Sequence, residues 1–168
     1  MSTLGDVFRE LNALKATGLV RDYALGGATA VLFYAEPTRT YDVDVFVLLA
    51  PTSDTSLVSL EALYSWARSR GFGTDAEHIL VHGVPVKFIP AHNRLAEEGV
   101  TTARTLDYDD VPVRVCDPEH LVALAFQAGG HTRRERAWHM IEAGVVDRPR
   151  LRALLAAHEI KVEIDDAL

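Results

Sequence analysis

Residues 24–47 read ALGGATAVLFYAEPTRTYDVDVFV, and this stretch decides the fold that we expect for the chain. Its first residues end a short strand over residues 21–25, and Gly26-Gly27 then leads into a helix over residues 28–35. A glycine pair between a strand and a helix exposes backbone N–H groups at a helix N-terminus, where the helix dipole favours a phosphate. Glycine also lets a ligand approach the backbone closely, because no side chain stands in the way. The turn is therefore a candidate phosphate site.

The strand that follows, over residues 42–49, begins with two carboxylates. Asp42 and Asp44 are expected on one face of this strand, about 7 Å apart along the backbone, and the opposite face is apolar. Two carboxylates on a strand that is otherwise buried are costly unless a positive charge lies between them. Magnesium binds through one or two carboxylates together with the phosphates of a substrate. Asp42 and Asp44 are therefore candidate ligands of Mg²⁺ or Mn²⁺ beside the glycine turn.

Each of the two motifs also has an ordinary interpretation. A pair of glycines is usually only a turn, and Asp42 and Asp44 alone could mark a solvated strand end with Arg39 as an ion-pair partner. Their combination in the order strand, glycine pair, helix and strand favours a site for a metal and a nucleotide.

The remaining sequence predicts more strands and then only helices. Apolar spacing and turn residues predict helices over residues 3–17, 54–70 and 91–103, hairpins of residues 77–81 with 84–89 and of 104–108 with 111–115, and helices over residues 118–128, 132–143 and 148–158. We therefore expect an α+β protein with a mixed sheet flanked by helices. Its α/β core would cover residues 1–116, and residues 117–168 would form a helical segment packed on that core.

The composition narrows the function classes. The chain has 168 residues, 48% of them hydrophobic, and a formal net charge of -7, which argues against broad binding to duplex DNA. The single cysteine, Cys116, excludes an internal disulfide and is expected to be buried. Residues 1–15 show no secretory signal, and no apolar run is long enough to span a membrane, so we expect a cytoplasmic protein without a membrane partner.

Three further groups of residues have competing interpretations. Residues 131–136 form a basic cluster at a helix start, which is either a solvated helix face or a contact for a triphosphate or an acceptor. His78 and His82 are too far apart on a strand to ligate one metal directly. Trp66 and Trp138 lie on amphipathic helices, where filling the core is the expected role.

Gly-Gly followed by Asp-x-Asp resembles the signature of the nucleotidyltransferase superfamily, whose members move a nucleoside monophosphate from an NTP to an acceptor. The chain is most similar to small bacterial nucleotidyltransferases related to abortive-infection and toxin–antitoxin enzymes. The resemblance implies a nucleotidyltransferase-like fold in which Gly26 and Gly27 cradle the triphosphate and Asp42 and Asp44 hold Mg²⁺ (or Mn²⁺) for catalysis. It implies an NTP as one substrate, leaves the acceptor open as RNA, protein or a small molecule, and leaves a homodimer open.

The sequence also departs from the family pattern. Ala28 stands where the family often has a serine, and the third carboxylate expected on the strand over residues 84–89 falls at Lys87. Three interpretations follow: Lys87 contacts phosphate, as Arg39 is also expected to do, with altered chemistry; another acid such as Glu77 or Asp107 takes its place; or the protein binds nucleotide without transferring it. The main hypothesis is a Mg-dependent nucleotidyltransferase with a partly degenerate site. The alternative is an inactive nucleotide-binding or protein-interaction module of the toxin–antitoxin type.

Overall fold

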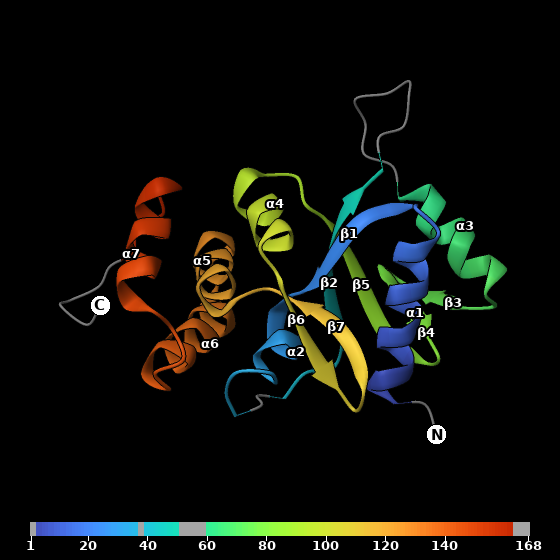
Figure 1. The fold of residues 1–168 in the computed structure, drawn as a ribbon, viewed down its shortest axis with the longest axis horizontal. Coiled ribbons are helices and arrows are strands. Elements are labelled where there is room, and N and C mark those ends of the chain that lie inside the picture. The colour runs from blue at the N-terminus through green and yellow to red at the C-terminus, as the bar shows by residue number, and fades with distance from the viewer. Residues whose placement is uncertain (1–2, 37–38, 51–59, 163–168) are drawn as a thin grey trace.

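The computed structural model describes residues 3–36, 39–50 and 60–162, and these form one mixed sheet with helices around it (Figure 1). The strands are β1 (Val20–Leu25), β2 (Val43–Leu49), β3 (Gly73–Asp75), β4 (His78–Val81), β5 (Val84–Pro90), β6 (Arg104–Tyr108) and β7 (Val111–Val115). Their order in the sheet is β3-β4-β5-β2-β1-β7-β6. The expected α+β class, a mixed sheet flanked by helices, is confirmed.

The middle of the sheet places the aspartate strand beside two others. β2 pairs antiparallel with β1 and parallel with β5, and β1 pairs in parallel with β7. In the pairing of β2 with β5, Asp44 lies opposite Lys87. Residues that are opposite one another on paired strands project their side chains to the same face of the sheet. Lys87 is therefore the direct neighbour of Asp44.

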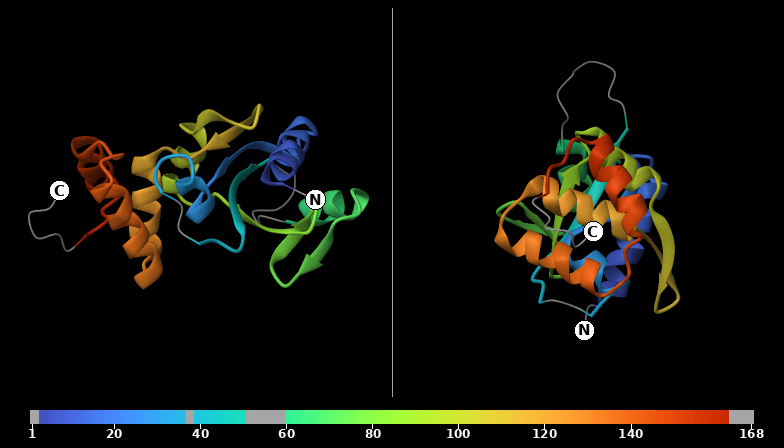
Figure 2. Two further views of the ribbon diagram at one scale, coloured as in Figure 1. Left: turned by 90° about the horizontal axis from the view of Figure 1, so that it is seen from below. Right: turned by 90° about the vertical axis from the view of Figure 1, so that its left-hand side faces the viewer.

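Helices surround the sheet, most of them toward its two ends. They are α1 (Leu4–Ala16), α2 (Gly27–Val31), α3 (Glu61–Ser69), α4 (Arg94–Thr101), α5 (Pro118–Ala128), α6 (His131–Glu142) and α7 (Arg148–Ala157). Figures 1 and 2 show α5, α6 and α7 together beyond one end of the sheet, with α1 and α3 at the other end. None of the helices that the structure describes is long and apolar enough to cross a bilayer.

One hydrophobic cluster connects the sheet to the C-terminal helices. In β2, Val43, Val45 and Val47 are at most 2% exposed, as expected for the apolar face of a strand. The same cluster of buried side chains continues through Met140 of α6 and Leu155 of α7. Burial of apolar surface is the main favourable term in folding, so this continuity holds the helical segment onto the sheet.

Cys116 was expected to be buried, and Trp66 and Trp138 were expected to fill the core; the packing confirms these expectations. Cys116 is fully buried. Trp66 is 7% exposed and packs against the ring of Phe72. Trp138 is partly buried, with its ring 5.6 Å from that of Phe126. These side chains contribute to packing.

Two expected elements are shorter than the sequence pattern indicates. The helix expected over residues 28–35 is α2, which ends at Val31; the next three residues donate backbone hydrogen bonds three residues back, so the chain continues in tight turns. The helix expected over residues 91–103 begins only at Arg94, because the N–H of Ala91 still bonds to the carbonyl of Val47 in the sheet and Asn93 provides the cap.

At the other elements the differences are small or lie outside the described residues. The helix expected over residues 54–70 is seen as α3, and the part of it before residue 60 falls among residues that the structure does not describe. The hairpin of β6 and β7 has the expected bounds. β3 was not expected, because its three residues are all exposed and show no apolar alternation.

Candidate active site

The glycine turn is packed directly against the aspartate strand. The N–H of Gly26 donates to the carbonyl oxygen of Asp44 at 2.9 Å, which ties the end of β1 to β2. Gly27 has a φ of +55°, and a Cβ placed on it would overlap the carboxylate of Asp44. A Cβ on Gly26 would overlap the ring of Phe46. Both positions therefore require glycine, and the backbone of the turn lies within contact of Asp44.

The expected phosphate site uses the turn more than the helix. α2 has five residues and Gly26 provides no side-chain cap, so the first N–H groups of the helix have no partner within it. A helix this short has a small dipole, because the dipole sums over its peptide units. The N–H groups without a partner in the helix, beginning with that of Gly27, are what the turn offers to an anion, rather than the helix dipole.

Two hydroxyl groups position Asp42 at the start of β2. The side chains of Thr29 and Thr40 donate to its carbonyl oxygen at 3.0 and 2.8 Å. This carbonyl is therefore held outside the regular strand, which begins at Val43. The carboxylate of Asp42 lies 3.1 Å from Nε2 of His78, a contact that residue spacing in the sequence did not indicate.

The surroundings of the Asp44 carboxylate shift its pKa. Burial raises the pKa of Asp44, the charge of Asp42 raises it further, and Lys87, Arg136 and Arg133 oppose this change. A raised carboxylate pKa means that the ionised form is disfavoured in the fold. A cation near Asp42 and Asp44 would relieve this cost, and two carboxylates that share a site with phosphate oxygens are a suitable donor set for Mg²⁺. The residues present therefore fit a divalent metal.

A cavity of about 480 Å³ opens beside Asp44 and Gly27. This is within the range of small-molecule sites, which are mostly apolar with a few polar groups. Its apolar wall includes Phe46 of β2 and Leu121 and Leu124 of α5. The cavity therefore lies between the sheet and the helical segment, and both parts of the chain are needed to form it.

Two arginines from α6 line the same cavity. Arg133 and Arg136 are part of the basic cluster over residues 131–136, and they are three residues apart, on one face of the helix. Burial lowers the pKa of Arg136, and the charge of Asp44 acts in the opposite direction. Neither guanidinium has a hydrogen-bond or ion-pair partner within the described part of the chain. Arg134 is exposed and does not line the cavity.

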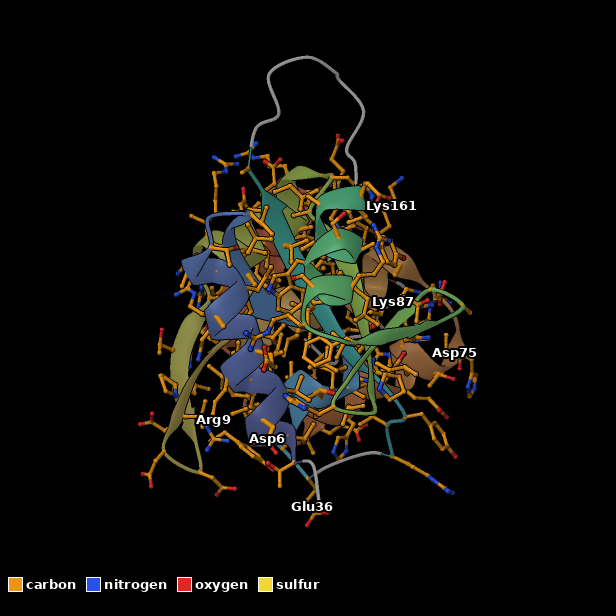
Figure 3. All side chains as sticks on the ribbon, turned by 90° about the vertical axis from the view of Figure 1, so that its right-hand side faces the viewer. Asp6, Arg9, Glu36, Asp75, Lys87 and Lys161 are labelled. Atoms are coloured by element: carbon orange, nitrogen blue, oxygen red, sulfur yellow. The ribbon has the colours of Figure 1, made fainter. Side chains whose placement is uncertain are left out.

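Lys87 also lines the cavity, and its ammonium group is paired. Nζ of Lys87 donates to a carboxylate oxygen of Glu77 at 2.8 Å, and this hydrogen bond raises the pKa of Lys87. Figure 3 shows Lys87 between α3 and the strands β3 and β4. Glu77 is thus close to the site, but it is 62% exposed and held by Lys87. Asp107 lies on β6 at the far edge of the sheet, with β1 and β7 between it and β2, so the fold does not bring it to the site.

Arg39, the other expected phosphate contact, does not line the cavity. It is exposed, and its guanidinium lies 5.1 Å from the ring centre of Tyr41. Its role stays a prediction. His82 lies away from Asp42, with its Nε2 3.2 Å from Glu10.

A polar bridge that the sequence analysis did not identify lies at the α4 side of the cavity. Nδ2 of Asn93 donates to Oε1 of Gln127 at 3.1 Å, which connects the start of α4 to the end of α5. Oδ1 of Asn93 caps α4 by accepting from the N–H of Ala96 at 2.9 Å. Both Asn93 and Gln127 line the cavity. Residues 34 positions apart carry no local signal of such a contact.

Comparison with known proteins identifies the fold. No protein-family model matches the chain, and no curated protein matches it in sequence. Among solved structures, it is similar to an antigenic nucleotidyltransferase-like protein from Paracoccidioides brasiliensis, with 17% identity over 98% of this chain and 96% of that chain and a TM-score of 0.56.

Two structures of the antibiotic-resistance factor ANT(2'')-Ia are also similar. The solution structure matches with 14% identity over 95% of this chain and 93% of that chain, with a TM-score of 0.53. The crystal structure in complex with adenylyl-2''-tobramycin matches with 12% identity over 94% of this chain and 98% of that chain, with a TM-score of 0.55. At these identities the likeness shows a shared nucleotidyltransferase-like fold.

Proposed function

We propose that the protein is a metal-dependent nucleotidyltransferase that moves a nucleoside monophosphate from an NTP to an acceptor. The observation that carries this proposal is the meeting of three groups at one cavity: the Gly26-Gly27 turn, the carboxylate of Asp44 and the unpaired guanidinium groups of Arg133 and Arg136. Exposed backbone N–H groups and arginine forks both bind phosphate, and a carboxylate beside them suits a metal that also binds phosphate.

Each group then has a distinct role. Asp42 and Asp44 would hold Mg²⁺ or Mn²⁺, which when bound neutralises phosphate charge and favours displacement at the α-phosphorus. The backbone N–H groups at the start of α2, beginning with that of Gly27, would bind the triphosphate, because the N–H of Gly26 is paired with Asp44. His78 orients the carboxylate of Asp42 from β4. The similarity in fold to ANT(2'')-Ia, which has been solved in complex with adenylyl-2''-tobramycin, supports this reaction class.

A second candidate function is nucleotide binding without transfer, and the identity of residue 87 favours it. The family pattern expects a carboxylate at this place, and the chain has Lys87 beside Asp44. A protonated lysine cannot ligate a metal. Glu77, an acid that could take its place, is paired with Lys87 at 2.8 Å. Such a protein would act as an inactive module, for example as one partner of a toxin–antitoxin pair.

The acceptor is proposed only by class, as RNA, a protein side chain or a small molecule. Approach of the acceptor requires space next to the α-phosphorus, and a cavity of about 480 Å³ is large enough for more than the phosphates alone.

Titration calorimetry tests the proposed function. Each NTP is titrated with Mg²⁺ or Mn²⁺ into the native protein, into Asp44→Asn and into the matched control Asp107→Asn, which changes an exposed aspartate on the distant strand β6. We expect NTP binding that gains strength with the metal in the native protein and in the control, and no such gain in Asp44→Asn. A folded native protein that binds no NTP would contradict the proposal.

Release of pyrophosphate then separates the two candidate functions. With Mg²⁺, an NTP and pooled candidate acceptors, a transferase releases pyrophosphate in the native protein and loses this release in Asp44→Asn. Metal-dependent NTP binding without pyrophosphate release for any acceptor class supports the binding module.

A further inference from the structure

We infer that this cavity binds a polyphosphate without any divalent metal, through the permanent positive charges of Lys87, Arg133 and Arg136. The inference rests on the proposed function in one respect, the choice of a polyphosphate as the ligand class. It goes beyond the proposed function because it separates binding of the ligand from binding of the metal.

The charges that face the cavity carry this inference. Among the described residues that line it, the charged side chains are three cations, Lys87, Arg133 and Arg136, and one carboxylate, Asp44. Asp42, the other nearby carboxylate, does not line the cavity and contacts His78 instead. An anion entering the cavity therefore meets more positive than negative charge before any metal is bound.

The two guanidinium groups are available for a ligand. Neither Arg133 nor Arg136 has a hydrogen-bond or ion-pair partner in the part of the chain that the structure describes. Arg136 is half-buried between α6 and the cavity, where water competes less for its N–H groups than at an open surface. Guanidinium groups bind phosphate through two parallel hydrogen bonds, so this pair is suited to successive phosphates of a chain.

Lys87 can change partners at little cost. Its present partner Glu77 is 62% exposed, and the Lys87 side chain is 35% exposed. Exposed ion pairs contribute little net free energy, because water solvates both partners well when they separate. An entering phosphate can therefore take the ammonium group from Glu77, which then returns to solvent.

The position of Lys87 explains why a metal is not required for binding. A site with only carboxylates repels a polyphosphate until a divalent cation has neutralised it. Here the neighbour of Asp44 in the β2–β5 register is Lys87, so the chain places an ammonium group near the half-buried carboxylate. The chain itself supplies a positive charge at that place.

The experiment is calorimetry with two probes, inorganic triphosphate and ATP, each in EDTA and then in Mg²⁺. The proteins are the native chain, Arg136→Gln, Lys87→Gln and the control Arg134→Gln, which removes an exposed charge from the same helix away from the cavity. We expect the native protein to bind both probes in EDTA. Removal of one charged hydrogen-bonding group weakens this metal-free binding roughly tenfold to a hundredfold, whereas Arg134→Gln changes it only slightly.

The outcomes separate this inference from the proposed function. Binding of both probes in EDTA, weakened by Arg136→Gln and Lys87→Gln, supports the inference. Binding only in Mg²⁺ overturns the inference and leaves the proposed function standing, whereas ATP binding under neither condition overturns both. Equal weakening by Arg134→Gln and Arg136→Gln also overturns it, because diffuse surface charge would then explain the affinity. If Arg136→Gln lowers the thermal midpoint strongly, Arg133→Gln, which alters an exposed side chain, takes its place.

Discussion

Replacing Asp117 by asparagine removes one charge from a buried network at the junction of the sheet and the helical segment. Asp117 is 1% exposed and caps α5 by accepting from the N–H of His120 at 2.8 Å. The same oxygen lies 2.9 Å from Nδ1 of His120, and the other oxygen accepts from Arg150 of α7 at 2.8 Å. Asparagine has the same size and keeps an oxygen for the cap, but its amide nitrogen can only donate, so Asp117→Asn removes the charge together with the acceptor for Arg150.

The pKa of Asp117 gives the size of the contribution that its charge makes to the free energy of unfolding. Burial opposes ionisation, but hydrogen bonds from His120 and the charges of His120 and Arg150 outweigh it and lower the pKa from 3.8 to about 2. A difference of this size corresponds to about 2 kcal/mol of stability at pH 7. Because the folded pKa is the lower one, this stability is complete above 3.8 and is lost as the pH falls toward 2. The contribution at pH 3 is therefore about 1 kcal/mol.

Urea unfolding followed by tryptophan fluorescence measures this contribution at pH 7 and pH 3. Asp147→Asn is the matched control, because Asp147 is exposed and caps α7 by accepting from the N–H of Arg150 at 3.0 Å. Asparagine caps a helix as well as aspartate does, so the control should change the free energy of unfolding by less than about 0.5 kcal/mol. A cost for Asp117→Asn as small as that of the control, or one that is equal at both pH values, would refute the reasoning.

Three further predictions concern the cavity. Gly27→Ala should abolish NTP binding in calorimetry, because the new Cβ overlaps the Asp44 carboxylate. The control is Gly83→Ala, which is also at positive φ but has no atom within 4 Å of its new Cβ. This control should lose only about 1–2 kcal/mol of stability through backbone strain and should bind NTP normally. Asp44→Asn should raise the midpoint of thermal unfolding in the absence of metal, since burial and the charge of Asp42 disfavour the ionised form of Asp44; a lower midpoint would contradict this. Lys87→Asp should make ATP binding dependent on Mg²⁺, and persistence of its binding in EDTA would show that Lys87 is not needed.

Local signals in the sequence were sufficient for several elements. Asp109-Asp110 and His82-Gly83 both have positive φ at each residue, which is the conformation of a tight hairpin turn, and the strands around them follow. Asp117 before Pro118 is a local signal for the start of α5, because the cap and the proline act within one turn of helix. These signals depend on neighbours in the chain, so no knowledge of the tertiary fold was required.

Local sequence indicated one part of the candidate site, and only the tertiary structure showed the other part. The turn and the aspartate strand are close in the sequence, with one short helix between them, and the structure places Gly27 in contact with Asp44. The sequence left the basic cluster over residues 131–136 between two interpretations. Only the packing of α6 on the cavity shows that Arg133 and Arg136 face Asp44 while Arg134 does not line it.

The sequence by itself predicted the α+β class with a mixed sheet, a phosphate site at the glycine pair before the aspartate strand, and Lys87 at the place where the resemblance implies a carboxylate. The tertiary structure decided which distant groups share a site: His78 with Asp42, Glu77 with Lys87, and α6 with β2. The physical reason is that periodicity, caps and turns are properties of neighbouring residues, whereas the order of strands and the packing of helices arise when the whole apolar surface is buried together.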